Sequence, residues 1–265
     1  MGALGQCYTF PLALPNAKLP LLGLRLDRTR TDDAYPFTVP SLAKLTSLKF
    51  PTPITFLVGE NGSGKSTLLE GIARALDYSL EGGSSNMKFP PTRQTATMDR
   101  LGRALRLEWS RGRAATGFFL RAESMFHVAN YLDEMSADDQ RTFNAYGGRS
   151  LHDQSHGESF LATIQNRCDW PGVYLFDEPE AALSPQRQLT VLSELHAIVQ
   201  QPGRQFLIAS HSPILLAYPG ATIYEFSAEG IKKVAYEETA SYRVTRDFLA
   251  SPERFLRHLL DLEEG

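Results

Sequence analysis

Short apolar runs alternate along the chain with patterns of helical period. The runs at 54–58, 173–176 and 205–209 are almost continuously apolar, as expected for strands buried on both faces of a parallel sheet. Apolar residues at helical spacing follow the first run at 66–76, and a second helix is predicted to begin after Ser184. Strands that alternate with helices predict an α/β fold, with a mostly parallel sheet flanked by helices.

The helix after Ser184 has the clearest boundaries in the sequence. The Ser184 side chain can cap its first turn, Pro185 suits its first position, and Pro202-Gly203 ends it. We predict that its apolar residues form one inward face, made of Leu189, Leu192, Leu195 and Val199.

Other segments predict an antiparallel β portion. The segment 21–27 alternates loosely and is predicted as a strand. The segments 221–226 and 231–236 are predicted to pair as a hairpin near the end of the chain, followed by two short helices. The segments 104–109 and 117–121 flank a short basic, glycine-containing turn and are predicted as another hairpin.

The organisation and composition are those of one globular domain. The chain has 265 residues, 42% hydrophobic and 22% charged, and we treat residues 1–265 as a single domain. The stretch from about 80 to 168 interrupts the alternation and is expected to be an inserted, partly helical lobe.

The net charge of −3 excludes binding to nucleic acid through overall charge. Two cysteines exclude a disulfide scaffold, and no apolar stretch is long enough to span a membrane, so a cytoplasmic location is expected.

A glycine-rich turn after the first buried run matches the phosphate-loop pattern GxxxxGK[ST]. Its glycines allow successive backbone N–H groups to point at phosphate oxygens. Lys65 can reach the β- and γ-phosphates, and the Ser66 hydroxyl can hold Mg²⁺. The sequence therefore predicts a nucleoside triphosphate at the residues Gly59, Glu60, Asn61, Gly62, Ser63, Gly64, Lys65, Ser66 and Thr67.

Two further predicted strands end in side chains that can act on a bound nucleotide. The run at 173–176 ends in Asp177 and Glu178, and the run at 205–209 ends in Ser210 and His211. Because ligands of open parallel sheets gather at the carboxyl ends of strands, these side chains are expected beside the phosphates. Asp177 fits a magnesium partner, directly or through water, and Glu178 fits the base that polarises an attacking water. His211 fits a hydrogen-bond partner of the γ-phosphate.

Five motifs follow one another along the chain: the phosphate loop, a serine-glycine helix start at 154–159, the Asp-Glu strand end, the stretch 179–184 and the strand that ends in histidine. These motifs and their order resemble those of the ABC-type ATPases. The resemblance covers residues 40 to 215. Within that superfamily the chain resembles a small group of predicted ATPases. This group is closer to the ATPases of chromosome maintenance, recombination repair and anti-phage defence than to transporter subunits.

The resemblance implies an ATP·Mg²⁺ site that is shared between two copies of the chain. The signature motif of the family maps to 154–158, where Ser155, Gly157 and Glu158 would contact the nucleotide on the partner, and His156 replaces a glycine. The residues 182–184 fall in the loop through which the two sites communicate. The magnesium-sensing glutamine of the family is expected after a strand, with Gln94 as the candidate. An aromatic residue that stacks on adenine would be Tyr35 or Phe37.

Three biological roles stay open at this stage. A nucleic-acid-linked ATPase is favoured by the family likeness and by seven arginines with few acidic neighbours, which can follow phosphates of DNA or RNA. A transporter subunit is a second role, and a regulatory switch for a partner effector protein is a third. The arginines are Arg93, Arg100, Arg103, Arg106, Arg111, Arg113 and Arg121.

Overall fold

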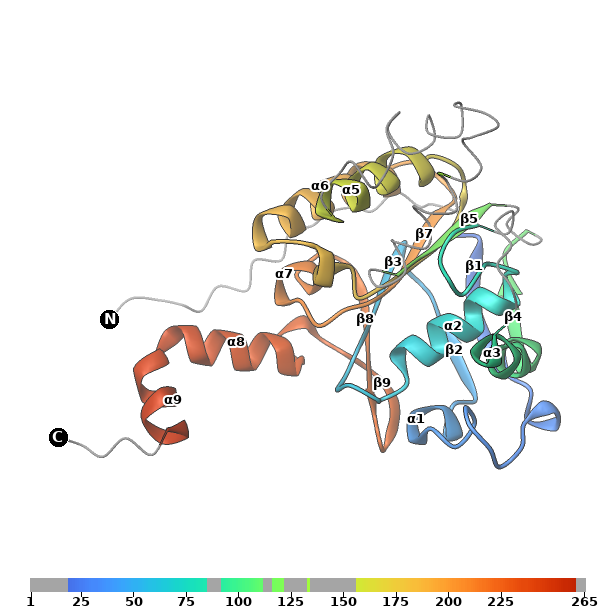
Figure 1. The fold of residues 1–265 in the computed structure, drawn as a ribbon, viewed down its shortest axis with the longest axis horizontal. Coiled ribbons are helices and arrows are strands. Elements are labelled where there is room, and N and C mark those ends of the chain that lie inside the picture. Colours follow the sequence, from blue (N-terminus) through green and yellow to red (C-terminus); the bar gives the residue numbers. More distant parts are fainter. Residues whose placement is uncertain (1–18, 85–91, 112–115, 122–132, 134–155, 261–265) are drawn as a thin grey trace.

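The computed structural model describes residues 19–84, 92–111, 116–121, 133 and 156–260 (Figure 1). Its centre is a six-stranded sheet in the order β5-β6-β7-β3-β8-β9. All neighbouring strands in it run parallel except the terminal pair β8–β9, which is the predicted hairpin. Its strands are β3 (Ile54–Val58), β5 (Gly117–Arg121), β6 (Gly172–Asp177), β7 (Arg204–Ala209), β8 (Thr222–Ser227) and β9 (Gly230–Val234).

A second, three-stranded antiparallel sheet has the order β2-β1-β4. It consists of β1 (Leu21–Leu26), β2 (Ser47–Lys49) and β4 (Leu105–Trp109). The predicted hairpin between the segments 104–109 and 117–121 is wrong, because β4 pairs with β1 in this sheet whereas β5 pairs with β6 in the central sheet. The described part of the stretch from 80 to 168 is therefore built into both sheets.

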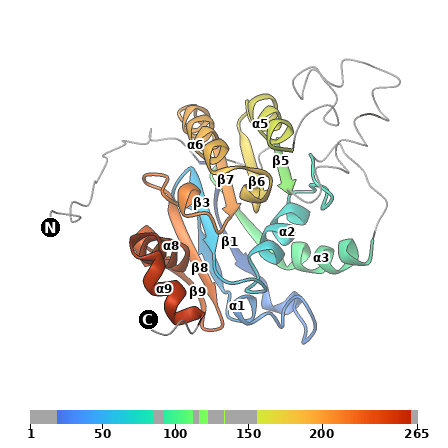
Figure 2. The same ribbon diagram turned by 60° about the vertical axis from the view of Figure 1, so that its left-hand side comes forward.

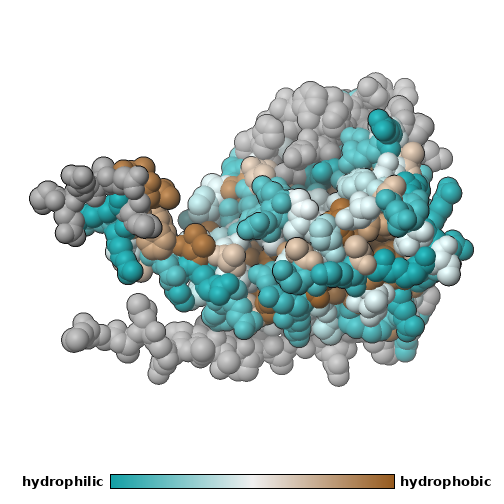
Figure 3. All heavy atoms as spheres, turned by 90° about the horizontal axis from the view of Figure 1, so that it is seen from below, coloured by the Kyte–Doolittle hydropathy of each residue, from teal (hydrophilic) through white to brown (hydrophobic). Residues whose placement is uncertain are grey.

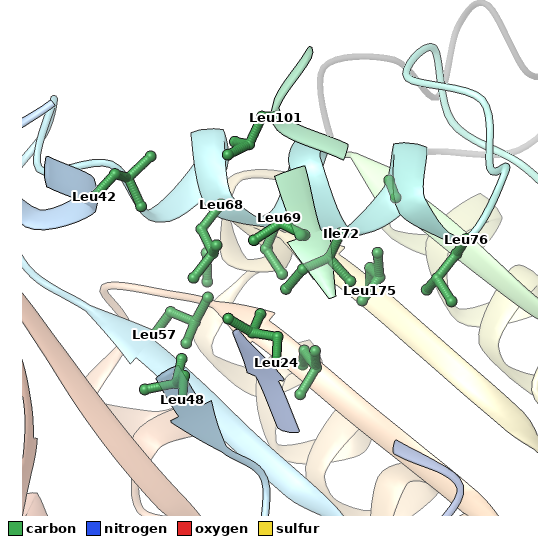
Figure 4. Packing of buried hydrophobic residues seen from close by; sticks show 14 of the residues in the cluster. Leu24, Leu42, Leu48, Leu57, Leu68, Leu69, Ile72, Leu76, Leu101 and Leu175 are labelled. Atoms are coloured by element: carbon green, nitrogen blue, oxygen red, sulfur yellow. The ribbon is translucent and has the colours of Figure 1, made fainter. Parts of the chain in front are cut away.

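Helices cover both faces of the central sheet, as the α/β fold requires (Figure 2). One core joins the antiparallel sheet, α2 and α3 to one face of the central sheet, and Figure 4 shows Leu57, Leu68 and Ile72 meeting there. The other core joins the opposite face to α5, α6 and α7. Successive residues of β6 divide between them, since Leu175 packs in the first core and Phe176 in the second.

The helices have the following bounds. The α-helices are α1 (Pro40–Ala43), α2 (Lys65–Ala75), α3 (Arg93–Ala104), α5 (His156–Arg167), α6 (Pro185–Val199), α7 (Pro213–Leu216), α8 (Ala240–Ala250) and α9 (Pro252–Leu259). Short 3₁₀ turns are η1 (Arg28–Arg30), η4 (Pro179–Ala182) and η5 (Tyr236–Glu238).

The inward face of α6 agrees with the prediction at Leu195 and Val199 and is shifted by one residue before them. Leu189 is 52% exposed and Leu192 is only partly buried, whereas Gln188 and Val191 are buried. The polar Gln188 can point inward because its amide donates to the Leu183 carbonyl at 3.2 Å and its oxygen accepts from the Ser212 hydroxyl at 2.5 Å. These bonds replace those lost to water on burial. The predicted Ser184 cap is present, with its hydroxyl accepting from the Arg187 N–H at 3.3 Å.

Helices α8 and α9 extend away from the body of the molecule (Figure 1). Their apolar side chains gather on this arm, which is partly hydrophobic in Figure 3. Phe248 and Phe255 meet edge to face there, with ring centroids 6.0 Å apart. Within the described residues, none of the helices has the length and apolar character needed to cross a membrane.

Candidate nucleotide-binding and active site

The phosphate loop lies between the carboxyl end of β3 and the first residue of α2. Gly59, Gly62 and Gly64 have positive φ values of 137°, 77° and 104°, which other residues rarely adopt. There is also no room for a side chain at Gly59, because a Cβ atom there would lie 2.4 Å from the Phe226 carbonyl oxygen. The glycines therefore allow a turn that aims backbone N–H groups and the start of α2 at one point, an arrangement that binds phosphate.

Lys65 lies at the start of α2 and its side chain curls back into the loop. Its Nζ donates to the carbonyl oxygens of Gly59 at 2.7 Å and Glu60 at 3.0 Å. Burial lowers the pKa of this lysine, although Glu178 and Asp177 oppose that effect. The ammonium group is thus held inside the loop, where it can reach the phosphates.

Ser66 and Asp177 meet across the sheet although 111 positions separate them in the sequence. The Ser66 hydroxyl donates to Asp177 Oδ1 at 2.9 Å. Asp177 is 4% exposed, and burial raises its pKa to about 6 despite the nearby Arg121 guanidinium and this hydrogen bond. A hydroxyl and a carboxylate are the oxygen ligands that Mg²⁺ prefers, and a buried carboxylate gains most from a cation, so this pair fits a magnesium ion.

Glu178 and His211 come together at the same edge of the sheet. His211 Nε2 lies 3.8 Å from Glu178 Oε1. Burial and the Lys65 charge lower the pKa of His211, although Glu178 and Glu180 oppose this, so the imidazole is neutral near pH 7. Its Nε2 atom is buried and has no hydrogen-bond partner among the described residues. Glu178 has a left-handed backbone (φ 49°), a conformation that is costly for this residue type and concentrates at functional sites.

Glu180 is a residue of this site that the sequence analysis missed. Its carboxylate accepts from the Ser210 hydroxyl at 3.0 Å and from the His211 backbone N–H at 2.5 Å. It therefore fixes the β7 end to the η4 turn and positions His211 relative to Glu178. Only its closeness to the Asp-Glu pair in the sequence could have indicated this role.

Gln94 is part of a helix, so its expected placement at a strand end is wrong. It lies in the first turn of α3, and its Nε2 donates to Glu70 Oε1 at 3.0 Å. The residue at the strand end beside Asp177 is Arg121, which the register pairs with Asp177. Arg121 is one of the seven arginines that the sequence groups as possible contacts to nucleic-acid phosphates, and the structure places it against Glu70 and Asp177 instead.

The signature segment is only partly described. Ser155 lies outside the described residues. Gly157 and Glu158 lie in the first turn of α5, which packs against η4 and α6 (Figure 2). A Cβ on Gly157 would lie 2.4 Å from Arg187 Nη1, and Glu158 pairs with Arg187 at 3.4 Å. The structure thus places this helix start beside the η4 turn that follows Glu178.

Two regions beside the phosphate loop can accept the rest of a nucleotide. Tyr35 is 51% exposed, and its hydroxyl lies 3.4 Å from the Thr67 hydroxyl, whereas Phe37 is buried in the core. Of the two predicted aromatic residues, Tyr35 is therefore the one at the site. A cavity of about 620 Å³ also borders the loop along Gly59–Ser63 and extends to His211 and the β8–β9 hairpin.

Comparison with family models gives two matches. A model described as "AAA domain" matches residues 39–108. A second, described as "AAA domain, putative AbiEii toxin, Type IV TA system", matches residues 119–217. The first match contains the phosphate loop and the second contains both strand ends with the acids and the histidine. No curated protein matches the chain.

Solved structures with low sequence identity share parts of the fold. One is described as "An inward-facing conformation of a putative metal-chelate type ABC transporter" (16% identity, 85% of this chain and 88% of that chain covered, TM-score 0.47). The SMC head domain from Thermotoga maritima also has 16% identity, with 82% and 98% covered and a TM-score of 0.44. A dimeric ATP-binding cassette in a post-hydrolysis state, bound to ADP and Pi, has 16% identity, 72% and 90% covered, and a TM-score of 0.42.

The two AAA matches meet in one site, since Ser66 in the first contacts Asp177 in the second. The motifs stand in the order expected for ABC-type proteins, on a mostly parallel sheet flanked by helices. The two AAA-domain segments therefore together form a P-loop ATPase site with its motifs in the ABC-type order, and the chain binds and hydrolyses ATP.

Proposed function

We propose that the chain binds ATP with magnesium between the phosphate loop, Asp177 and His211, and that two copies close around two nucleotides before hydrolysis. The observation that carries this proposal is the contact between Ser66 and Asp177, with Lys65 and the Glu178–His211 pair beside it. We also propose that residues 1–265 act as one ATPase domain in the cytoplasm.

Each side chain has a role that follows from its position. Lys65 leaves the carbonyl oxygens of its own loop and donates to the β- and γ-phosphates. Ser66 and Asp177 hold magnesium, which neutralises phosphate charge when bound. Glu178 accepts a proton from the attacking water. The buried Nε2 of His211 donates to the γ-phosphate, since that atom otherwise has no partner among the described residues.

The second copy supplies the groups that one chain lacks. A helix start offers N–H groups and a positive dipole end to an anion, which fits the segment at 155–158. This segment packs on η4, which begins directly after Glu178. A nucleotide held between the two copies therefore contacts the phosphate loop of one chain and the signature helix of the other. Loss of the γ-phosphate removes this bridge and opens the dimer.

The variant Glu178→Gln tests hydrolysis and dimerisation together. It should bind ATP, hydrolyse it at least about a hundredfold more slowly because the base is lost, and accumulate as a dimer with ATP and Mg²⁺. Size-exclusion chromatography with light scattering measures the dimer, and phosphate release measures hydrolysis. Glu253→Gln, on the projecting helix α9, is the matched control and should resemble the wild type. A Glu178→Gln protein that stays monomeric with ATP·Mg²⁺ would contradict the dimer.

For the biological role we propose a nucleic-acid-linked process such as repair or defence. Arg30, Arg103 and Arg106 line one recess beside Trp109, with Asp27 paired to two of these arginines. Their excess positive charge can meet phosphates of DNA or RNA. A gel shift that weakens steeply with salt and is lost in Arg103→Ala/Arg106→Ala supports this role. No shift, together with ATPase activity that DNA and RNA leave unchanged, favours a transporter subunit or a regulatory switch.

A further inference from the structure

Four polar side chains connect the proposed magnesium site to helix α3, and we call them the Arg121 relay. Arg121 Nε lies 3.4 Å from Asp177 Oδ2, and Arg121 Nη1 donates to Glu70 Oε1 at 2.7 Å. Gln94 Nε2 donates to the same Glu70 oxygen at 3.0 Å. The four residues belong to β6, β5, α2 and α3, so the relay joins two strands to both helices on this face.

The charged side chains of the relay are largely removed from water. The side chains of Glu70 and Asp177 are 5% and 4% exposed, and that of Arg121 is 19% exposed. One guanidinium therefore faces two buried carboxylates, so these three groups carry a net charge of −1 when both acids are ionised. A buried carboxylate without a cation is strongly unfavourable, so Arg121 has a structural reason to stay close to both.

Magnesium would bring a second cation to the same carboxylate. The Asp177 oxygen Oδ1 accepts from Ser66, and the other oxygen Oδ2 faces Arg121. Two cations on one carboxylate repel each other, and this repulsion is strong where water is largely excluded. The bond to Glu70 gives Arg121 an alternative partner within its present reach.

We propose that Arg121 is a positioning residue that competes with magnesium for Asp177 and pairs more fully with Glu70 when the metal binds. This proposal rests on the proposed magnesium site at Ser66 and Asp177. Arg121 orients the Asp177 carboxylate in the nucleotide-free protein. Gln94 and Arg121 donate to the same oxygen of Glu70. A change in the Arg121–Glu70 pair therefore alters the hydrogen bond that Glu70 makes to the first turn of α3. Occupation of the metal site is thereby transmitted to that helix.

Two substitutions should shift magnesium binding in opposite directions. Arg121→Met removes the competing cation and should lower the half-saturating magnesium concentration about tenfold, within the usual range for coupled sites. Glu70→Gln removes the alternative partner, leaves Arg121 on Asp177 and should raise that concentration. Arg121→Lys keeps the charge and should resemble the wild type. Arg257→Met, which removes an arginine from a surface ion pair with Glu253 on α9, is the matched control and should leave both magnesium titrations unchanged.

Magnesium dependence is measured in two ways. The first is thermal unfolding of the nucleotide-free protein at increasing Mg²⁺, and the second is the magnesium dependence of ATP hydrolysis. If Arg121→Met does not fold, Glu70→Gln still decides, because an unchanged or lowered magnesium requirement in this variant overturns the proposal. A purely structural Arg121 would change stability or kcat and leave both magnesium titrations where they were.

Asp177→Asn separates failure of the relay from failure of the metal site. If this variant titrates with magnesium like the wild type, the magnesium site itself is misplaced. If it loses the magnesium response while Arg121→Met and Glu70→Gln titrate like the wild type, the metal site stands and the competition by Arg121 is refuted.

Discussion

Replacing Asp177 by asparagine should stabilise the nucleotide-free protein at neutral and higher pH. The pKa of this buried carboxyl rises from 3.8 to about 6, with burial as the largest cause. At about 1.4 kcal/mol per pH unit, this rise corresponds to about 3 kcal/mol between the ionised and neutral forms. Asparagine resembles the neutral form and can still accept from the Ser66 hydroxyl. The expected gain in unfolding free energy is therefore up to about 3 kcal/mol.

The gain should depend on pH in a definite direction. Between pH 4 and pH 6 the folded protein holds a proton on Asp177 that the unfolded chain has released. The stability that Asp177 contributes is therefore greatest below its unfolded pKa and is lost as the pH rises through about 6. The difference between Asp177→Asn and the wild type should be small near pH 4 and reach its full value by pH 8.

Guanidinium unfolding without nucleotide or magnesium, followed by circular dichroism at several pH values, measures this difference. Asp27→Asn is the matched control, because hydrogen bonds from Thr29 and Arg106 lower the pKa of Asp27 and its replacement should be more harmful as the pH rises. A difference for Asp177→Asn that does not change with pH, or that becomes more destabilising at pH 8, would refute the reasoning. ATP with Mg²⁺ should stabilise the wild type more than this variant.

Three further substitutions test separate parts of the account. Lys65→Ala should weaken ATP binding by more than about tenfold because a charge-assisted contact to phosphate is lost, and unchanged affinity in calorimetry would contradict its role. Tyr35→Ala should weaken ATP binding by about three- to tenfold through lost stacking, whereas Tyr35→Phe should bind like the wild type. Ser184→Ala removes the cap of α6 and should cost about 1 kcal/mol, seen as a Tm lower by about 2–4 °C with ATP affinity unchanged.

The local motifs of the site could be predicted because each one is continuous in the sequence. The phosphate loop, the Asp177-Glu178 strand end and the His211 strand end each combine an apolar run with a polar turn. Their placement at one edge follows from a general property of parallel sheets. Whether these residues have the proposed roles stays a prediction.

Partners that are distant in the sequence could not be predicted. The strand pattern at 117–121 was clear, but nothing local shows that β5 pairs with β6 and not with β4. For the same reason the sequence groups Arg121 with arginines that could contact nucleic acid, although Arg121 pairs with Glu70 and Asp177. The inward face of α6 was misplaced because apolar spacing alone gives no sign that the polar Gln188 is buried with partners.

The most direct test is a crystal structure of the Glu178→Gln protein with ATP and Mg²⁺. The account predicts one triphosphate with Lys65 on its β- and γ-phosphates, a metal ion held by Ser66 and Asp177, His211 at the γ-phosphate and the adenine beside Tyr35. A triphosphate bound out of reach of Lys65 and Asp177, such as in the part of the cavity lined by the β8–β9 hairpin, would contradict it.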